Sequence, residues 1–320
     1  MVRTRLDGLD GLRGIAAAAV LLSHVYPDVP FRGYLAVDFF FMLSGYVMAR
    51  RYEPALVAGG WRSARPFLAA RLRRLYPTVV MASLLGLPWL FAEAGGAAPT
   101  LAVATLLLIP WDGPTGPYML NPPMWSIAFE LLANLVHALL LARLGIRPLL
   151  LLAAGVMLML ALAVGSHGLD LVPSAGNRAL VAMRTIAPYA IGVVLYRRWR
   201  DRPPVRLGAV ATWALMPLAF AAAALLPAPG HGADFLFVLL ACPLLIAGGL
   251  THGRGSRVAR AAGALSFPLY AVHGPVVLSL KSMGFGAALQ IATAVAAAIV
   301  LLGLTRLSWR PSVSRRSLAA

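Results

Sequence analysis

Two ionisable side chains, Arg13 and His24, lie inside the first apolar stretch of the sequence. Eleven residues of α-helix make about three turns, so both side chains project from nearly the same face, roughly 16 Å apart along the axis. A guanidinium binds anions such as phosphate, and an imidazole can act as a general base near neutral pH. The pair therefore predicts an anion site and a base at different depths of one helix. The alternatives are an arginine that reaches toward the lipid headgroups and a histidine in ordinary packing.

Two carboxylates are expected at the depth of His24. Asp38 lies near the start of the second apolar run, and Glu130 lies in the first third of a run that begins near residue 124. A carboxylate beside an imidazole orients the ring and raises its basicity, so we expect His24, Asp38 and Glu130 to converge. Asp38 could instead stabilise a helix N-terminus, and Glu130 could join two helices by a hydrogen bond.

A pair of arginines, Arg71 and Arg74, precedes the third apolar run. Residues three apart share a helix face, whereas Arg73 points elsewhere. Guanidinium groups paired in this way suit a phosphate ligand that arrives from the cytosol. The alternative is positive charge that only sets the orientation of the chain in a membrane.

Two polar stripes follow the same helical spacing. The first consists of Ser126, Glu130, Asn134 and His137, and the second of Ser266, Tyr270 and His273. Spacings of three and four residues place the members of each stripe on one face. Both could line a substrate site, or they could be hydrogen-bonded packing between helices.

No metal site is predicted. The six histidines are scattered, no histidine pair stands with carboxylates at ligand spacing, and Cys242, the single cysteine, lies in an apolar run.

The secondary-structure elements that carry these side chains belong to a very apolar chain. Of the 320 residues, 60% are hydrophobic and 12% are charged, whereas a soluble domain has about 25% charged residues. The composition therefore predicts a polytopic membrane protein. The net charge of +17 does not indicate nucleic acid, because the arginines fall between apolar runs and not in one block.

Eleven apolar runs predict the helices: 12–27, 33–50, 75–92, 101–110, 124–142, 147–166, 179–196, 205–227, 234–251, 262–280 and 284–305. The run 101–110 is too short to span about 30 Å of hydrocarbon, so we expect a re-entrant or surface helix there. With ten spans, about 24 of the Lys and Arg residues fall on the cytoplasmic side, together with both termini. That side includes Arg3, Arg5, a long non-apolar loop at 51–74, a cluster with Arg254, and the arginines from Arg306 to Arg316. We expect an all-α membrane helix bundle that forms a single domain over 1–320.

Five motifs in this order resemble the acyltransferase-3 family of membrane acyltransferases, which includes O-antigen and exopolysaccharide O-acetylases. They are "LDGLRGIAAAAVLLSH", "GYLAVDFFFMLSGYVMARRY", "RLRRLYP", "PMWSIAFE" and "LSFPLYAVHGP". The resemblance covers almost the whole chain. It implies about ten helices and a bacterial cytoplasmic (inner) membrane location.

The resemblance also implies an activity: transfer of an acyl group, commonly acetyl, from cytoplasmic acyl-CoA to a hydroxyl of a carbohydrate or small-molecule acceptor. Arg13 and His24 fit the family's Arg/Lys-x10-His motif, and Arg71 and Arg74 fit its Arg-x-x-Arg motif, which is associated with acyl-CoA. Some members carry an added esterase-like domain, and we expect none here. Acyl-CoA is a co-substrate and no resident cofactor is implied.

The predicted site combines both sources. Arg13, Arg71 and Arg74 are expected to hold the acyl-CoA phosphates, and His24 is expected to act as the general base with Asp38 and Glu130 beside it. Motif residues expected to bind substrate are Ser44, Trp125, Ser126, Tyr270 and His273. A covalent acyl-histidine or acyl-serine intermediate stays open, as does the oligomeric state.

Two other classes of function compete with this one. A transporter or flippase would use buried Arg, His, Asp and Glu to relay protons or to escort a polar headgroup. Inverted repeats or paired broken helices would favour it, and the sequence contains neither. A purely structural membrane subunit would not account for so many ionisable groups within the spans.

Overall fold

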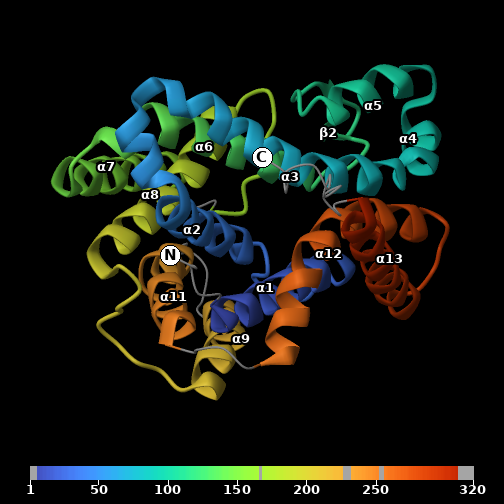
Figure 1. Ribbon diagram of the computed structural model, residues 1–320. Coiled ribbons are helices and arrows are strands. Elements are labelled where there is room, and N and C mark those ends of the chain that lie inside the picture. Colours follow the sequence, from blue (N-terminus) through green and yellow to red (C-terminus); the bar gives the residue numbers. More distant parts are fainter. Residues whose placement is uncertain (1–5, 166–167, 226–231, 252–255, 309–320) are drawn as a thin grey trace, which may run out of the picture.

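The computed structural model describes residues 6–165, 168–225, 232–251 and 256–308, and its ribbon is almost entirely helical (Figure 1). The longer helices are α1 (Asp7–Val25), α2 (Leu35–Gly59), α3 (Ala64–Leu84), α6 (Met124–Leu139), α7 (Ile146–Val164), α8 (Arg178–Trp199), α9 (Ala209–Leu225), α11 (Cys242–Thr251), α12 (Arg257–Ser282) and α13 (Ala287–Ser308). Shorter elements are α4 (Leu87–Ala94), α5 (Ala98–Leu106), α10 (Gly232–Leu236), the 3₁₀ turns η1 (Gly60–Ser63), η2 (Gly95–Ala97) and η3 (Leu141–Arg143), and the π-helical turn η4 (Phe237–Ala241). The strands β1 (Asp112–Gly113) and β2 (Gly116–Pro117) form a small antiparallel hairpin.

Within the described residues, seven helical segments are long and apolar enough to cross a membrane. They match seven of the ten predicted spans, the runs that begin at 12, 124, 147, 179, 234, 262 and 284. An eighth span results if the bent pair Leu35–Leu84 and Leu87–Leu106 is counted as one. The run 205–227 corresponds to α9, which has 17 residues. The chain is therefore an all-α polytopic membrane protein with about seven candidate spans.

The prediction of a non-apolar loop at 51–74 was wrong. Helix α2 continues to Gly59, a single 3₁₀ turn follows, and α3 begins at Ala64. This segment is rich in Ala, Leu and Arg, which are strong helix formers, and long arginine side chains can extend from a helix into polar surroundings. Charge alone was therefore a poor indication of a loop.

The short run 101–110 does form a short helix, α5. It follows α4 and the turn η2, and the chain bends before α4, where the segments Leu35–Leu84 and Leu87–Leu106 meet at 59°. This angle is typical of a broken span or a re-entrant loop. The β1–β2 hairpin comes next and leads into α6.

Close helix contacts build the bundle. Figure 1 shows α1, in blue, beside α12, in orange, although they lie at opposite ends of the sequence. Helices α2 and α8 approach at Gly192, where an added Cβ would lie 1.9 Å from the carbonyl oxygen of Met42. Small residues at such crossings let helix backbones approach closely, which is typical of membrane bundles.

Helices α7 and α13 leave long apolar side chains on the outside, among them Leu151, Leu162 and Val300. In a membrane protein such side chains face lipid. The predicted positions of both termini, and of Arg3, Arg5, Arg254, Arg310, Arg315 and Arg316, lie outside the described residues.

Candidate functional site: two adjoining cavities

The larger cavity, here called the basic cavity, has a volume of about 570 Å³. Five helices line it, namely α1, α2, α3, α6 and α12. Along α2 its lining extends from Val37 to Arg51, a helical distance of about 20 Å. The cavity is therefore long enough to hold an extended ligand between the helices.

Arginines dominate the charged lining of the basic cavity. The guanidinium groups are those of Arg13, Arg50, Arg51, Arg71 and Arg74, against the carboxylates of Asp10 and Glu130. Arg13 lies 3.5 Å from Asp10, and Arg71 donates to Glu130 over 2.6 Å. The excess positive charge suits an anionic ligand with several phosphates. The structure thus brings together all three predicted anion-binding residues, Arg13, Arg71 and Arg74.

Glu130 belongs to this basic cavity and not to the neighbourhood of His24. One of its oxygens, Oε1, accepts hydrogen bonds from Ser44 and Arg71, each over 2.6 Å. The expected convergence of Glu130 with His24 was therefore wrong. A carboxylate removed from water takes the nearest guanidinium, because an unpaired charge there is costly.

A second, smaller cavity of about 170 Å³ contains His24 and is here called the histidine cavity. Its lining also includes Thr115 and Pro117 from the hairpin region, Trp125 at the start of α6, and Arg184 of α8. The His24 side chain is exposed, and its Nδ1 lies 2.8 Å from the carbonyl oxygen of Val20. A carbonyl only accepts, so a neutral His24 carries its proton on Nδ1 and keeps a lone pair on Nε2. That tautomer is the one a general base requires.

His273 lies beside His24. The two rings meet edge to face with centroids 4.9 Å apart, and the His273 side chain is fully buried. Its Nδ1 lies 2.6 Å from the Tyr270 carbonyl oxygen, while its buried Nε2 has no hydrogen-bond partner among the described residues. His273 therefore supports the His24 ring directly and borders neither cavity.

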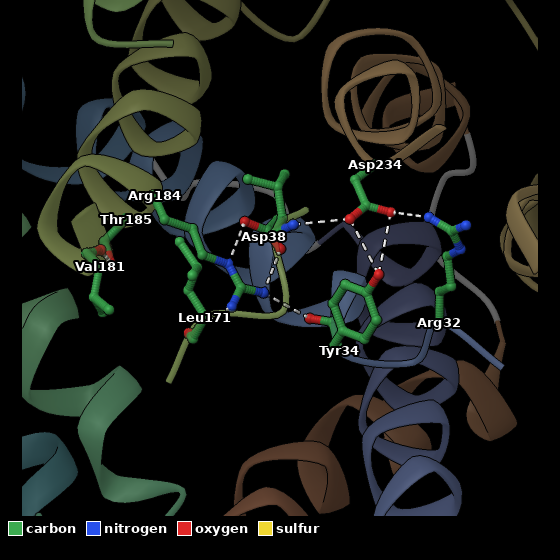
Figure 2. Close-up of polar contacts among 9 residues, drawn as sticks. Arg32, Tyr34, Asp38, Leu171, Val181, Arg184, Thr185 and Asp234 are labelled. Carbon is green, nitrogen blue, oxygen red and sulfur yellow. Dashed lines mark hydrogen bonds and ion pairs between the residues drawn. The ribbon is translucent and has the colours of Figure 1, made fainter. Parts of the chain in front are cut away.

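Asp38 is held by Arg184, as Figure 2 shows. The two side chains are each 1% exposed, and Arg184 donates to both carboxylate oxygens, over 2.8 and 3.2 Å. The expectation that Asp38 orients His24 was therefore wrong: in the described part of the chain no hydrogen bond joins the two. Arg184 also donates to the carbonyl oxygens of Leu171 and Tyr34, which ties α2, α8 and the segment before α8 together.

A second buried carboxylate extends this network. Asp234, which is fully buried, accepts hydrogen bonds from the Tyr34 hydroxyl, the Arg32 guanidinium and the Leu169 backbone N–H (Figure 2). The Tyr34 hydroxyl is the donor of its contact with Asp234, because an ionised carboxylate can only accept. The network forms one wall of the histidine cavity through Tyr34 and Arg184.

The remaining predicted residues divide between the two cavities. Ser44 and Ser126 line the basic cavity, Trp125 lines the histidine cavity, and Tyr270 lines both. The predicted stripe on α6 is split, because Asn134 and His137 form a buried hydrogen-bonded cluster with Tyr189. Their packing interpretation is the one that the structure supports.

Sequence reasoning assigned no site role to several residues that border these cavities. They are Asp10, Arg50, Arg51 and Arg184, with Asp234 behind them. A charged side chain inside an apolar run costs free energy in the membrane, and this cost made Arg13 a functional candidate. The same argument applies to Arg184, so the sequence could have identified it. The sequence could not have identified Arg50 and Arg51, because they stand at the end of an apolar run, where arginines are common for orientation alone. Among the described residues no group of three or more His, Cys, Asp or Glu side chains is placed to hold a metal ion.

Comparison with known proteins gives one family and several partial relatives. The family model described as "Acyltransferase domain" matches residues 6–309. The chain is 44% identical over 82 residues to "Protein 2 in picA locus" of Rhizobium radiobacter, a match that covers 24% of this chain and 41% of that protein.

Two relatives are named after a reaction. A "Putative O-acetyltransferase" of Staphylococcus aureus (strain COL) is 34% identical over 76 residues, covering 24% of this chain and 13% of that protein. A "Putative peptidoglycan O-acetyltransferase" of Bacillus subtilis (strain 168) is 33% identical over 85 residues, covering 27% and 13%. The matched segments thus span less than half of these relatives' own lengths. No solved structure matches the chain.

Proposed function

Because the chain belongs to the acyltransferase-3 family, whose model matches residues 6–309, we propose that it is a membrane O-acyltransferase that uses acyl-CoA as donor. The acceptor is a hydroxyl of a carbohydrate or related molecule, and the acyl group is acetyl. The chain acts as a single domain in the bacterial cytoplasmic membrane. The names of the Staphylococcus aureus and Bacillus subtilis relatives favour O-acetylation.

The observation that carries this proposal is the pair of adjoining cavities. One holds five arginines, which suits the phosphates of acyl-CoA, and the other holds an accessible imidazole in the tautomer of a base. The adenine nucleotide of the donor lies at the arginines, and its acyl-pantetheine arm lies along the apolar side chains of α2 toward the histidine cavity.

His24 carries the chemical step. Its Nε2 takes the proton of the acceptor hydroxyl while the hydroxyl oxygen attacks the thioester carbonyl carbon. The C–S bond then breaks, the acyl group stays on the acceptor oxygen, and the leaving thiolate takes up the proton to give CoA-SH. His273 positions the His24 ring through their edge-to-face contact. Asp38 acts one step further away, by holding Arg184 in the cavity wall.

The topology is part of the proposal. The arginine-rich end of the basic cavity faces the cytoplasm, in agreement with the positive-inside rule, and the histidine cavity faces the opposite side. Ten spans with both termini in the cytoplasm satisfy this arrangement when α9 and the bent α2–α5 region are counted as membrane-embedded.

The test is release of CoA thiol from acetyl-CoA by the purified protein with candidate hydroxyl acceptors. Since general base catalysis contributes about 10²- to 10⁴-fold, His24→Ala should lower kcat by that order and leave the KM for acetyl-CoA nearly unchanged. Arg73→Ala is the control, because Arg73 is exposed on α3 and, among the described residues, its side chain bonds only to the Ala69 carbonyl of its own helix. Equal thiol release by wild type and His24→Ala would remove His24 from the reaction.

A transporter or flippase is the second candidate, because two cavities on either side of a thin wall are also typical of alternating access. If no acceptor and no acyl chain length supports thiol release by the wild type, transport becomes the better account. Flux of a labelled polar lipid into vesicles that contain the protein would then test it.

A further inference from the structure

The wall between the basic cavity and the histidine cavity is very thin. Two residues, Val37 of α2 and Tyr270 of α12, line both cavities. Both are nearly buried, with Val37 6% and Tyr270 7% exposed. A ligand that extends from one cavity into the other must therefore pass these two side chains.

Tyr270 is held across this passage by contacts of its hydroxyl with Ser126 Oγ and, over 3.5 Å, with the Pro123 carbonyl oxygen, and by ring contacts. Its hydroxyl lies 2.6 Å from Ser126 Oγ. Because Ser126 already donates to the Pro123 carbonyl oxygen over 3.0 Å, the tyrosine hydroxyl is the donor of the pair. The Tyr270 ring packs edge to face on Phe40, with centroids 5.9 Å apart, and contacts His273 at 5.3 Å.

The two wall residues differ in their freedom to move. Val37 is β-branched and lies within a helix, where one rotamer is strongly preferred. Tyr270 is not β-branched and can rotate after its hydroxyl gives up the contacts with Ser126 and Pro123 and its ring gives up the ring contacts. The movable part of the wall is therefore the tyrosine.

The proposed function requires the passage to open. Acyl-CoA phosphates at the arginines and a hydroxyl at His24 are in different cavities, so the thioester carbon has to reach the far side of Tyr270. We propose that Tyr270 is a gate, latched by Ser126, that closes the passage between the two cavities until the acyl group displaces it. Its size then limits the acyl chains that can reach His24. This inference rests on the proposed function, but its first test does not.

The first test measures accessibility. Cys242, the only cysteine of the sequence, is fully buried and is replaced by Ala, and Thr115→Cys then introduces one thiol at the histidine cavity. A small charged methanethiosulfonate is added to sealed vesicles from the side of the basic cavity. With Tyr270 present the thiol should be labelled only at background rate. With Tyr270→Ala the rate should rise toward that seen when the reagent is added from the opposite side.

Labelling from the opposite side is the folding control, because a folded variant keeps its wild-type rate there. Tyr270→Phe keeps the ring and removes the latch, so it should give a smaller increase than Tyr270→Ala. Its matched control is Tyr189→Phe, another buried tyrosine with side-chain hydrogen bonds, which lines neither cavity and should leave the rate at background. If a folded Tyr270→Ala variant labels only at background, Tyr270 is not the gate.

The second test measures the acyl chain. In Tyr270→Ala the ratio of kcat/KM for octanoyl-CoA to that for acetyl-CoA should rise by about tenfold, since a few methylenes against a side chain give discrimination of that order. An unchanged ratio would overturn the part of the proposal that concerns acyl size.

The two tests separate this inference from the proposed function. Increased labelling in Tyr270→Ala, with no thiol release from any acyl-CoA, would keep the gate and remove the acyltransferase activity. If thiol release depends on His24 but labelling is unaffected by the Tyr270 substitutions, the proposed activity stands and the proposal that Tyr270 is a gate is wrong.

Discussion

The Arg71 guanidinium forms an ion pair with Glu130 and also lines the basic cavity. Its side chain is nearly buried and donates from Nη2 to Glu130, while its buried Nε has no hydrogen-bond partner among the described residues. The Arg71 side chain lines the basic cavity, where an anionic ligand would recover part of the cost of desolvating its guanidinium group. Arg71 is therefore the arginine on which donor binding should depend most directly.

Arg71→Ala should raise the KM for acetyl-CoA by about tenfold or more, because a hydrogen bond to a charged group contributes about 1.5–3 kcal/mol. The KM for the acceptor and kcat should change much less. Steady-state kinetics with each substrate varied in turn measures this. Arg73→Ala is the matched control, because Arg73 is rotated by about 100° around the helix from Arg74 and lies outside the cavity. A larger change in the acceptor KM would contradict the assignment.

The Asp38–Arg184 pair is a matter of stability and not of proton transfer. Both partners are 1% exposed, so removal of one leaves a buried charge without its counterion. Arg184→Met should therefore lower the free energy of unfolding by about 3–5 kcal/mol.

The exposed pair Arg178–Asp112 offers a matched control. Arg178→Met should cost less than about 1 kcal/mol, because solvent screens an exposed pair. Thermal unfolding in detergent compares the two variants. Equal losses would mean that Asp38 and Arg184 are hydrated in the native protein.

At the scale of the helices, four elements carry residues of both cavities, and one of them is α6, with Trp125 in the histidine cavity and Glu130 in the basic cavity. Helix α1 brings Arg13 to the basic cavity and His24 to the histidine cavity, α2 contributes Val37 to both, and α12 contributes Tyr270 to both. The positions of these helices depend on their partners. Helix α2 packs on α8 and α1 packs on α12. A change at these crossings should therefore disturb both cavities at once.

Gly192→Ala tests the α2–α8 crossing. The added methyl group would lie 1.9 Å from the Met42 carbonyl oxygen, so the backbones must separate, at a cost of about 1–3 kcal/mol for overpacking. We expect a lower unfolding temperature and reduced activity together.

Gly155→Ala on α7 is the control, because an added methyl group there meets nothing within 4 Å. Replacement of a glycine within a helix by alanine should stabilise by about 0.5–1 kcal/mol. A Gly192→Ala variant as stable as Gly155→Ala would show that α2 and α8 are further apart than in this structure.

At the scale of the whole molecule, the arginines and His24 lie in different cavities, so the two ends of the bundle differ in charge. The five guanidinium groups of the basic cavity lie on α1, α2 and α3, and His24 lies eleven residues along α1 from Arg13, in the other cavity. If the positive-inside rule orients the chain, acyl-CoA binds from the cytoplasmic side alone.

Sealed vesicles of known orientation test this directly. Acetyl-CoA, which does not cross a bilayer, should support thiol release in inside-out vesicles and not in right-side-out vesicles until detergent opens them. Raising ionic strength should increase the KM for acetyl-CoA in the active orientation, because salt screens the arginines over a Debye length of about 8 Å at 0.15 M. Activity from the opposite side alone would reverse the proposed topology.

The sequence by itself determined the class of protein, most of the spans and the family. Apolar runs of about 20 residues need no tertiary information, because each helix satisfies its own backbone hydrogen bonds in lipid. Helical spacing also predicted which residues share a face: Arg71 with Arg74, and Ser126 with Glu130, and in the structure all four line the basic cavity.

Only the tertiary structure decided which carboxylate meets which cation. The sequence predicts Asp38 and Glu130 at the depth of His24, but depth along a helix leaves rotation and neighbours open, and in the structure Arg184 and Arg71 are their partners. The boundary between the two cavities could not be predicted from the sequence for the same reason. It is made by Val37 and Tyr270, which are far apart in the sequence, and it exists only because helix packing brings α2 and α12 to opposite sides of one passage.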